Sequence, residues 1–147
     1  MELCDEYIRE FIQIFPEWND FYQLMLDPTM TYSCGIFASE DSTLEEASLA
    51  KYDRIIDQLK IEPHHHVLEI GCGWGGFAAR LAERTGAKLT ATTISEEQFK
   101  YARERVENVG AADRISIVKQ DYRKLSGQFD RIVSIEMIEA VGHEYLP

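Results

Sequence analysis

Three glycines at alternate positions, Gly71, Gly73 and Gly75, follow Glu69 in the stretch VLEIGCGWGG. Glycine lets a chain turn sharply and lets a ligand approach its backbone closely. Residues of strand type precede this loop and residues of helix type follow it, which is the context of a cofactor-binding turn. The loop therefore predicts a bound cofactor, with a tight turn that holds no ligand as the alternative.

Cys34 stands in a second unusual stretch, MTYSCGIF (residues 30–37). This stretch follows Asp27-Pro28, where a helix is expected to stop, and it precedes the start of another helix. A thiol here is a nucleophile, a metal ligand or a simple packing residue, and the stretch alone does not decide among them.

Three consecutive histidines, His64, His65 and His66, carry the side chains of a metal site. Consecutive residues of a strand alternate between its two faces, so three neighbours cannot all reach one ion. We therefore interpret them as a solvated turn before a strand and predict no metal site.

The elements that position these residues fall into two groups. Amphipathic spacing predicts helices over residues 8–15, 18–25 and 42–60, the last with Ser42 and Glu45 as a capping box. After Pro63, strands alternate with helices, which predicts a parallel sheet in an α/β fold. The predicted strands are 66–71, 88–94, 115–121 and 129–137, and the helices are 76–86, closed by Gly86, and 95–110, capped by Ser95 and ended by Gly110.

The composition is that of a globular protein, with 45% hydrophobic residues among 147 and a net charge of −11. No apolar run reaches the length of a membrane span, and the three cysteines have no paired spacing, so we predict a reducing, cytoplasmic location. Residues 1–60 hold 13 acidic and 4 basic side chains, a net charge of −9. This excess argues against a nucleic-acid partner and against electrostatic docking on anionic lipid.

Five stretches follow one another along the chain: NDFYQLMLDPTMTYSCGIF, EIGCGWGGFA, TTISEEQ, DYRKL and FDRIVSIEMIEAVGHEYLP. Together they resemble the cyclopropane fatty acid synthase family, which includes the mycolic acid cyclopropane synthases and belongs to the class I S-adenosylmethionine-dependent methyltransferases. The resemblance begins near residue 19 and leaves residues 1–17 unmatched. It implies a helical lid over residues 1–60 and, over residues 61–147, a Rossmann-like domain with strand order 3-2-1-4 and helices on both faces.

The resemblance implies that S-adenosyl-L-methionine binds at the carboxyl ends of the strands. The glycine loop is one residue tighter than the dinucleotide pattern and resembles the loop that meets the amino-acid end of this cofactor. The ends of the second and third strands would meet the ribose and the adenine, although most class I members have an acid where this chain has Thr93, Ser95 and Gln98. The implied cofactor-binding residues are Tyr32, Ser33, Glu69, Gly71, Gly73, Gly75, Thr93, Ile94, Ser95, Gln98, Asp121, Tyr122 and Arg123.

The family adds a methyl group to a cis double bond of an unsaturated phospholipid acyl chain and closes a cyclopropane ring, with a bicarbonate ion as general base. By resemblance, Cys34 lies beside the bicarbonate and is no nucleophile, while Glu139 holds the ion. Glu139 also fits a second interpretation, an acid at the start of a helix. The family further implies peripheral contact with the inner face of a membrane.

The predicted strands are fewer than those of the family domain, which indicates an incomplete copy that is inactive on lipid by itself. Two other functions stay open. One is a related methyltransferase that acts on an amine or another small acceptor, which product analysis would reveal. The other is a fragment that binds the cofactor without catalysis, which calorimetry would reveal.

Overall fold

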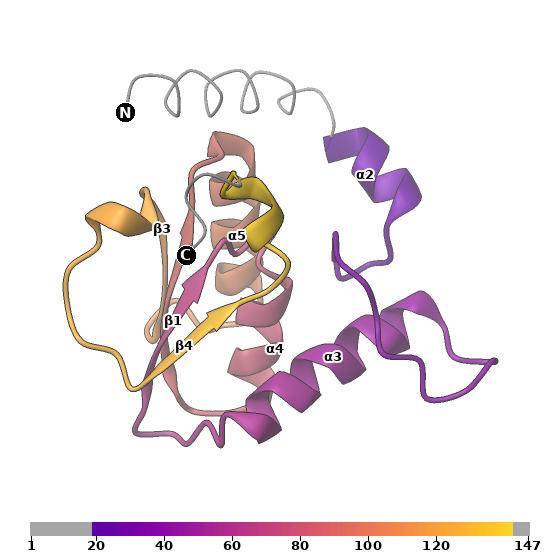
Figure 1. Cartoon of the computed structure of the whole chain (residues 1–147), viewed down its shortest axis with the longest axis horizontal. Helices are drawn as coiled ribbons and strands as arrows, with labels where there is room; N and C mark the ends of the chain where they lie inside the picture. Colours follow the sequence, from indigo (N-terminus) through magenta and orange to yellow (C-terminus); the bar gives the residue numbers. More distant parts are fainter. Residues whose placement is uncertain (1–18, 143–147) are drawn as a thin grey trace.

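The computed structural model describes residues 19–142, which form a parallel sheet with helices packed against it (Figure 1). The predicted helix over residues 8–15 lies outside the described residues. The elements are α2 (Asn19–Met25), α3 (Leu44–Gln58), β1 (His66–Ile70), α4 (Gly76–Arg84), β2 (Lys88–Thr93), α5 (Glu96–Asn108), β3 (Ile115–Lys119), the 3-10 turn η1 (Tyr122–Lys124), β4 (Arg131–Ser134) and the 3-10 turn η2 (Ile138–Ala140).

The strand order is β3-β2-β1-β4 and every pair is parallel, which confirms the predicted sheet. Residues paired in register share a face of the sheet, and the buried strand residues Val67, Leu89 and Ile115 form one such row. The helices α3, α4 and α5 contribute to the same hydrophobic cluster as this row. The described helices therefore cover one face, and the second helical layer that the resemblance implied is not seen within residues 19–142.

α3 begins with a capping box that is shifted by one residue from the prediction. The N-cap is Thr43, whose hydroxyl accepts the N–H of Glu46, while the Glu46 carboxylate accepts the N–H of Thr43 at 2.8 Å. Ser42 instead accepts the N–H of Ser39. The prediction of Ser42 was wrong because serine and threonine are both followed by glutamate three residues later, so the spacing could not choose between them.

α4 ends before the predicted closing glycine, whereas α5 ends as predicted. Thr85 takes an extended conformation, and its hydroxyl donates to the carbonyl of Leu81, which replaces a glycine cap. Gly86 does not adopt the left-handed conformation. At the end of α5, Gly110 does adopt it, with φ +67°.

β4 is shorter than predicted and has an uncovered side chain. Its regular pairing stops at Ser134, and Glu136 then adopts φ +45°, which turns the chain out of the strand. Within the described sheet β4 pairs with β1 alone, and Ile132 is 58% exposed. Among residues 19–142, no helix has the length and apolar character that would cross a bilayer.

Candidate functional site

The glycine loop joins β1 to α4 at the carboxyl edge of the sheet. All three glycines have left-handed φ values, +79° for Gly71, +52° for Gly73 and +78° for Gly75. A β-carbon on Gly71 would press on the Met137 side chain, and one on Gly75 would press on Ala102. A β-carbon on Gly73 would meet nothing within 4 Å, so this part of the loop faces open space. The loop thus presents a bare backbone to a ligand at Gly73 and uses its outer glycines for packing.

Glu69 is a buried acid with incomplete hydrogen bonding. It pairs in register with Ala91 and Val133, on the face that the helices cover, and its Oε2 has no hydrogen-bond partner. Burial raises the pKa of Glu69 to about 8. Its charge would also disfavour ionisation of Cys72 in the glycine loop, whose thiol pKa burial already raises. An unpartnered carboxyl oxygen directly beneath the loop is available to a polar group of a ligand.

The end of β2 carries the residues expected to meet a ribose, and they bind one another. The hydroxyl of Thr93 donates to Oε1 of Gln98 at 2.8 Å and accepts the N–H of Ser95 at 3.2 Å. Ser95 caps α5 by accepting the N–H of Gln98. Ile94 between them is exposed. Because Thr93 binds the oxygen of the Gln98 amide, the amide nitrogen can donate to a ligand. Thr93, Ser95 and Gln98 thus form an uncharged polar surface whose side chains hold one another in place.

The end of β3 carries Asp121, Tyr122 and Arg123 in the η1 turn. The guanidinium of Arg123 donates from Nε to both carboxylate oxygens of Asp121, at 3.0 and 2.9 Å. These contacts hold the pKa of Asp121 below its usual range. Arg123 therefore faces Asp121 in this structure, and Asp121 presents an ionised acceptor beside the Tyr122 ring.

The loop after α2, residues 27–34, which we call the lid loop, is fixed over α3 and α4 by a hydrogen-bond network. Asp27 accepts the N–H of Thr29 at 2.8 Å and the hydroxyl of Ser48 at 3.2 Å. The hydroxyl of Thr31 lies between the hydroxyls of Thr29 and Tyr52, at 2.5 and 2.7 Å. The network holds the lid loop close to the glycine loop, although Cys34 and Gly71 are 37 positions apart along the chain.

Arg105 of α5 is a second anchor of the lid loop. Its guanidinium donates to the carbonyl oxygens of Pro28 and Thr29, at 2.8 and 2.6 Å, and to that of Trp74 in the glycine loop at 3.2 Å. No sequence pattern predicts this role, because an arginine at this position of an amphipathic helix is expected to face solvent. Its three carbonyl partners are backbone atoms, which no side-chain pattern reveals.

Cys34 lies at the exposed end of the lid loop and contacts Glu136. Its backbone N–H donates to Oε1 of Glu136 at 3.0 Å, and its thiol donates to the same oxygen. This hydrogen bond raises the pKa of the Cys34 thiol, so the nucleophilic thiolate is disfavoured. Ser33 accepts a hydrogen bond from Lys51, and Tyr32 packs edge-on against Tyr22 at 5.2 Å between ring centroids. Glu136 and Lys51 were not among the predicted site residues.

Glu139 lies in the η2 turn and is exposed, and no hydrogen bond to it is found among the described residues. The family resemblance indicated Glu139, but Glu136 follows the end of β4 more closely. The structure brings Glu136, and not Glu139, to Cys34.

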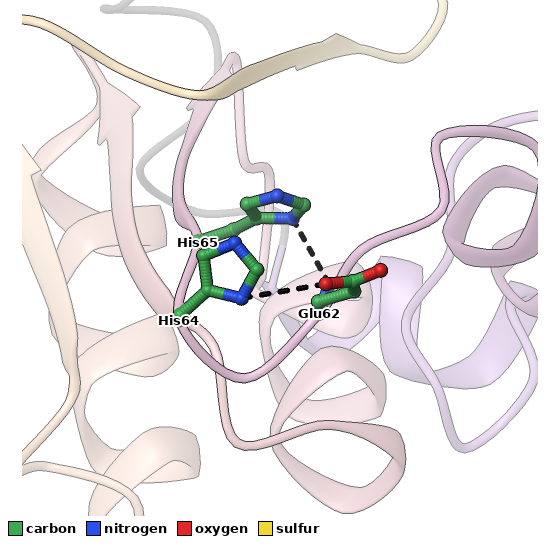
Figure 2. A group of neighbouring side chains, drawn as sticks. All are labelled: Glu62, His64 and His65. Atoms are coloured by element: carbon green, nitrogen blue, oxygen red, sulfur yellow. Dashed lines mark hydrogen bonds and ion pairs between the residues drawn. The ribbon is translucent and has the colours of Figure 1, made fainter.

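The histidine stretch lies at the amino end of β1, opposite the carboxyl ends of the strands, and Figure 2 shows His64 and His65 beside Glu62. Only His66 belongs to β1, and His64 and His65 lie in the preceding turn, so strand alternation does not apply to them. Their ring nitrogens and the Glu62 carboxylate lie within 4.8 Å of one another. The Nδ1 atom of His65 already accepts the N–H of Glu62 at 3.0 Å, which leaves the proton on Nε2. His65 is also buried, so the predicted solvated turn holds for His64 alone.

Comparison with known proteins identifies relatives along almost the whole chain. The sequence model of the family described as mycolic acid cyclopropane synthetase matches residues 7–147. The match starts well before residue 19, so the prediction that residues 1–17 are unmatched was wrong for residues 7–17. The chain is 46% identical over 124 residues to the cyclopropane-fatty-acyl-phospholipid synthase of Escherichia coli K12, covering 84% of this chain and 31% of that protein. It is 42% identical over 130 residues to a probable fatty acid methyltransferase of Pseudomonas putida, covering 87% and 33%.

Solved structures share the fold. A mycolic acid cyclopropane synthase complexed with SAH and CTAB superimposes with a TM-score of 0.81 at 36% identity, over 86% of this chain and 44% of that one. Coclaurine N-methyltransferase bound to N-methylheliamine and SAH superimposes with a TM-score of 0.77 at 27% identity, over 82% and 36%. The chain spans about a third of the length of the two curated relatives.

Proposed function

The chain belongs to the mycolic acid cyclopropane synthetase family, and from this membership we propose that it takes part in S-adenosylmethionine-dependent methyl transfer to a cis double bond of an unsaturated phospholipid acyl chain, giving a cyclopropane fatty acid. One observation carries the proposal above all. The left-handed, unobstructed backbone of Gly73 opens beside a lid loop that Arg105 and Tyr52 hold in place. This arrangement provides a site into which a ligand can approach the main chain closely.

The residues present fit the proposed cofactor, which when bound supplies an electrophilic methyl group on a sulfonium. Gly73 would admit the amino-acid end, and the unpartnered Oε2 of Glu69 would accept a hydrogen bond there. Gln98 at the end of β2 and Asp121 at the end of β3 would bind the ribose and adenine groups, with the Tyr122 ring alongside. Tyr32 and Ser33 would cap the site from the lid loop. Each of these roles requires the residue to bind or orient the cofactor, and none requires it to transfer a proton.

An apolar substrate is supported by the surface of the lid. Several large apolar side chains of α2 and the following loop are exposed: Phe21, Leu24, Met25, Tyr32, Ile36 and Phe37. Apolar side chains gathered on one segment offer a surface for an acyl chain and reduce the access of water to it. A carbocation formed at a double bond requires such exclusion of water. We further propose a cytoplasmic location with peripheral membrane contact, through these side chains rather than through charge.

The bicarbonate ion of the family does not fit beside Cys34 in this structure. By resemblance Cys34 lies beside the ion, but in this structure Oε1 of Glu136 already accepts both the N–H and the thiol of Cys34. Glu139, the other expected partner, lies in the η2 turn without a hydrogen bond to Cys34. We therefore derive no proton transfer through a bicarbonate ion, and we keep Glu139 as a proposed carboxylate of the site.

The test is incubation of the purified chain with S-adenosylmethionine and vesicles of unsaturated phospholipid, followed by mass spectrometry of the acyl chains. Acyl chains heavier by one methylene group, with the double bond lost, would support cyclopropane formation. A methylated acyl chain that keeps unsaturation would point to the chemistry of a fatty acid methyltransferase instead. Cofactor binding without any product would leave only a binding fragment.

A second candidate is methyl transfer to an amine. Structural similarity to coclaurine N-methyltransferase at 27% identity favours it. The acyl proposal has stronger support, because identity to the lipid enzymes is higher and the lid surface is apolar. A methylated nitrogen in a small-amine assay, with no change in phospholipid, would reverse this order.

A further inference from the structure

Glu136 places one carboxylate oxygen where both donors of Cys34 converge. Oε1 accepts the backbone N–H at 3.0 Å and also the thiol, across 102 residues of sequence. No described residue hydrogen-bonds Oε2. Two donors that meet at one point form a position for an anion, and here an atom of the chain itself fills that position.

Lys51 fixes the same loop from the opposite side. This lysine is buried in α3, and its ammonium donates to the Ser33 hydroxyl and, at 2.9 Å, to the carbonyl of Cys34. Burial lowers the pKa of Lys51, and the carboxylate of Glu136 acts in the opposite sense. A positive and a negative side chain therefore hold the backbone of Cys34 on its two sides, Glu136 at its N–H and Lys51 at its C=O.

The backbone of Glu136 is strained in a way that serves this contact. Its φ of +45° lies in the left-handed region, which is unfavourable for a residue with a β-carbon. A glycine would adopt the same conformation without that cost. The turn at Glu136 directs its side chain back toward Cys34. Backbone strain of this kind persists where the surrounding structure requires the residue.

We propose that Glu136 is a built-in anion of this site: its carboxylate occupies the position at Cys34 where the family resemblance expects bicarbonate, and it positions the Tyr32–Cys34 segment of the lid loop. The identity of that segment as a cofactor cap rests on the proposed function. The occupation of the Cys34 donors by Glu136 does not.

The experiment measures the alkylation rate of Cys34 by iodoacetamide at pH 8, followed by mass spectrometry of the peptide that contains it. Each protein is measured in sodium bicarbonate and in sodium chloride of the same ionic strength. The variants are Glu136→Gly, which removes the carboxylate and suits the backbone, and Glu136→Gln, which fills the position without charge. Glu104→Gln, at an exposed carboxylate of α5 outside the site, is the control.

In the wild type, bicarbonate should leave the alkylation rate unchanged, because Glu136 already accepts both hydrogen-bond donors of Cys34. Glu136→Gly should react about three- to tenfold faster in chloride, since no carboxylate opposes thiolate formation. Bicarbonate should then slow it by entering the vacated position. Glu136→Gln should also react faster but remain insensitive to bicarbonate, and Glu104→Gln should match the wild type.

Three results would overturn the proposal. Slowing of the wild type by bicarbonate would show that an external anion takes the position. Equal alkylation rates for all variants would show that Glu136 does not contact the Cys34 thiol in solution. A Glu136→Gly rate that ignores bicarbonate would show that no anion position exists there.

Calorimetry with S-adenosylmethionine separates this inference from the proposed function. If the wild type binds the cofactor, Glu136→Gly should bind it about three- to tenfold more weakly. Without Glu136 the loop would be less ordered before binding, and ordering it would cost binding free energy. Unchanged affinity would contradict the positioning role. If the wild type does not bind, the cofactor proposal for this chain fails, while the alkylation pattern still decides whether Glu136 occupies the anion position.

Discussion

The hydroxyl of Tyr52 lies 2.7 Å from the point that a β-carbon on Gly76 would occupy. The same hydroxyl is 2.7 Å from Oγ1 of Thr31 in the lid loop. One side chain of α3 therefore contacts both the first residue of α4 and the lid. Burial raises the pKa of Tyr52 to about 12, so the hydroxyl keeps its proton throughout the physiological range.

The Tyr52–Gly76 contact predicts that Gly76→Ala destabilises the chain by roughly 1–3 kcal/mol, the usual cost of overpacking. Alanine normally stabilises a helix relative to glycine. A loss of stability in Gly76→Ala would therefore point to the contact with Tyr52. Tyr52→Phe removes the oxygen and should recover part of the loss in the double variant. Urea unfolding of the two single variants and the double variant measures this coupling. Additive effects would show that the two residues do not clash.

Gly73→Val should abolish binding of S-adenosylmethionine, because the side chain would fill the open space in front of the loop. Gly110→Val is the matched control. Gly110 has a similar left-handed φ of +67° and also has nothing within 4 Å of a built β-carbon, but it lies at the far end of α5. Calorimetry should show lost binding in the first variant and retained binding in the second. Equal affinity of Gly73→Val and wild type would mean that the cofactor does not approach this loop.

Glu69 predicts a pH dependence of stability with a definite sign. Its pKa is about 8 in the folded chain, against 4.5 for an ordinary glutamate, so the folded state holds a proton that the unfolded state releases. The free energy of unfolding should therefore fall as pH rises from about 4.5 to 8, by roughly 3–5 kcal/mol. Urea unfolding at pH 5 and at pH 8.5 measures the change.

Glu69→Gln should flatten this dependence, because the amide has no proton to lose. Glu104→Gln, at an exposed position of α5, should keep the wild-type slope. Parallel curves for wild type and Glu69→Gln would show that Glu69 ionises in the folded chain without cost.

Zinc should leave the midpoint of thermal unfolding unchanged, despite the cluster of Glu62, His64 and His65. To bind through Nε2, His65 would have to give up the hydrogen bond at Nδ1 or lose its remaining proton. His64→Ala should behave like the wild type in the presence and absence of zinc. A stabilisation that depends on zinc concentration and disappears in His64→Ala would establish a metal site and contradict this prediction.

The uncovered β4 strand predicts association of the chain in solution. Ile132 is exposed, and a hollow of about 210 Å³ lies between β4 and α3, lined in part by Ile55 and Leu59. Exposed strand edges and apolar surface recruit other chains. Size-exclusion chromatography with light scattering should show a mass that rises with concentration, and Ile132→Lys should reduce it. A monomer at all concentrations in the wild type would contradict this expectation.

The sequence by itself determined the parallel sheet and the glycine loop, while the strand order was implied by the family resemblance. Periodicity is a local property, so the alternation of strands and helices after Pro63 could be read from neighbouring residues. The conformation of the loop was equally readable, because only glycine adopts left-handed φ at alternate positions without strain. Element ends were less certain, and the shift from Ser42 to Thr43 at α3 shows why: two adjacent residues carried the same signal.

The tertiary structure alone decided which residues meet at the site. Glu136 and Glu139 follow the same strand, and nothing in their local sequence says that Glu136 reaches Cys34 while Glu139 does not. The sequence pattern predicts Lys51 and Arg105 as solvent-facing polar residues of amphipathic helices. In the structure they bind backbone carbonyls of the lid loop. Contacts between residues far apart in the chain depend on how the helices pack on the sheet and on a single left-handed turn after β4. A linear pattern carries the periodicity of each element, but it does not carry the direction in which one side chain points toward another element.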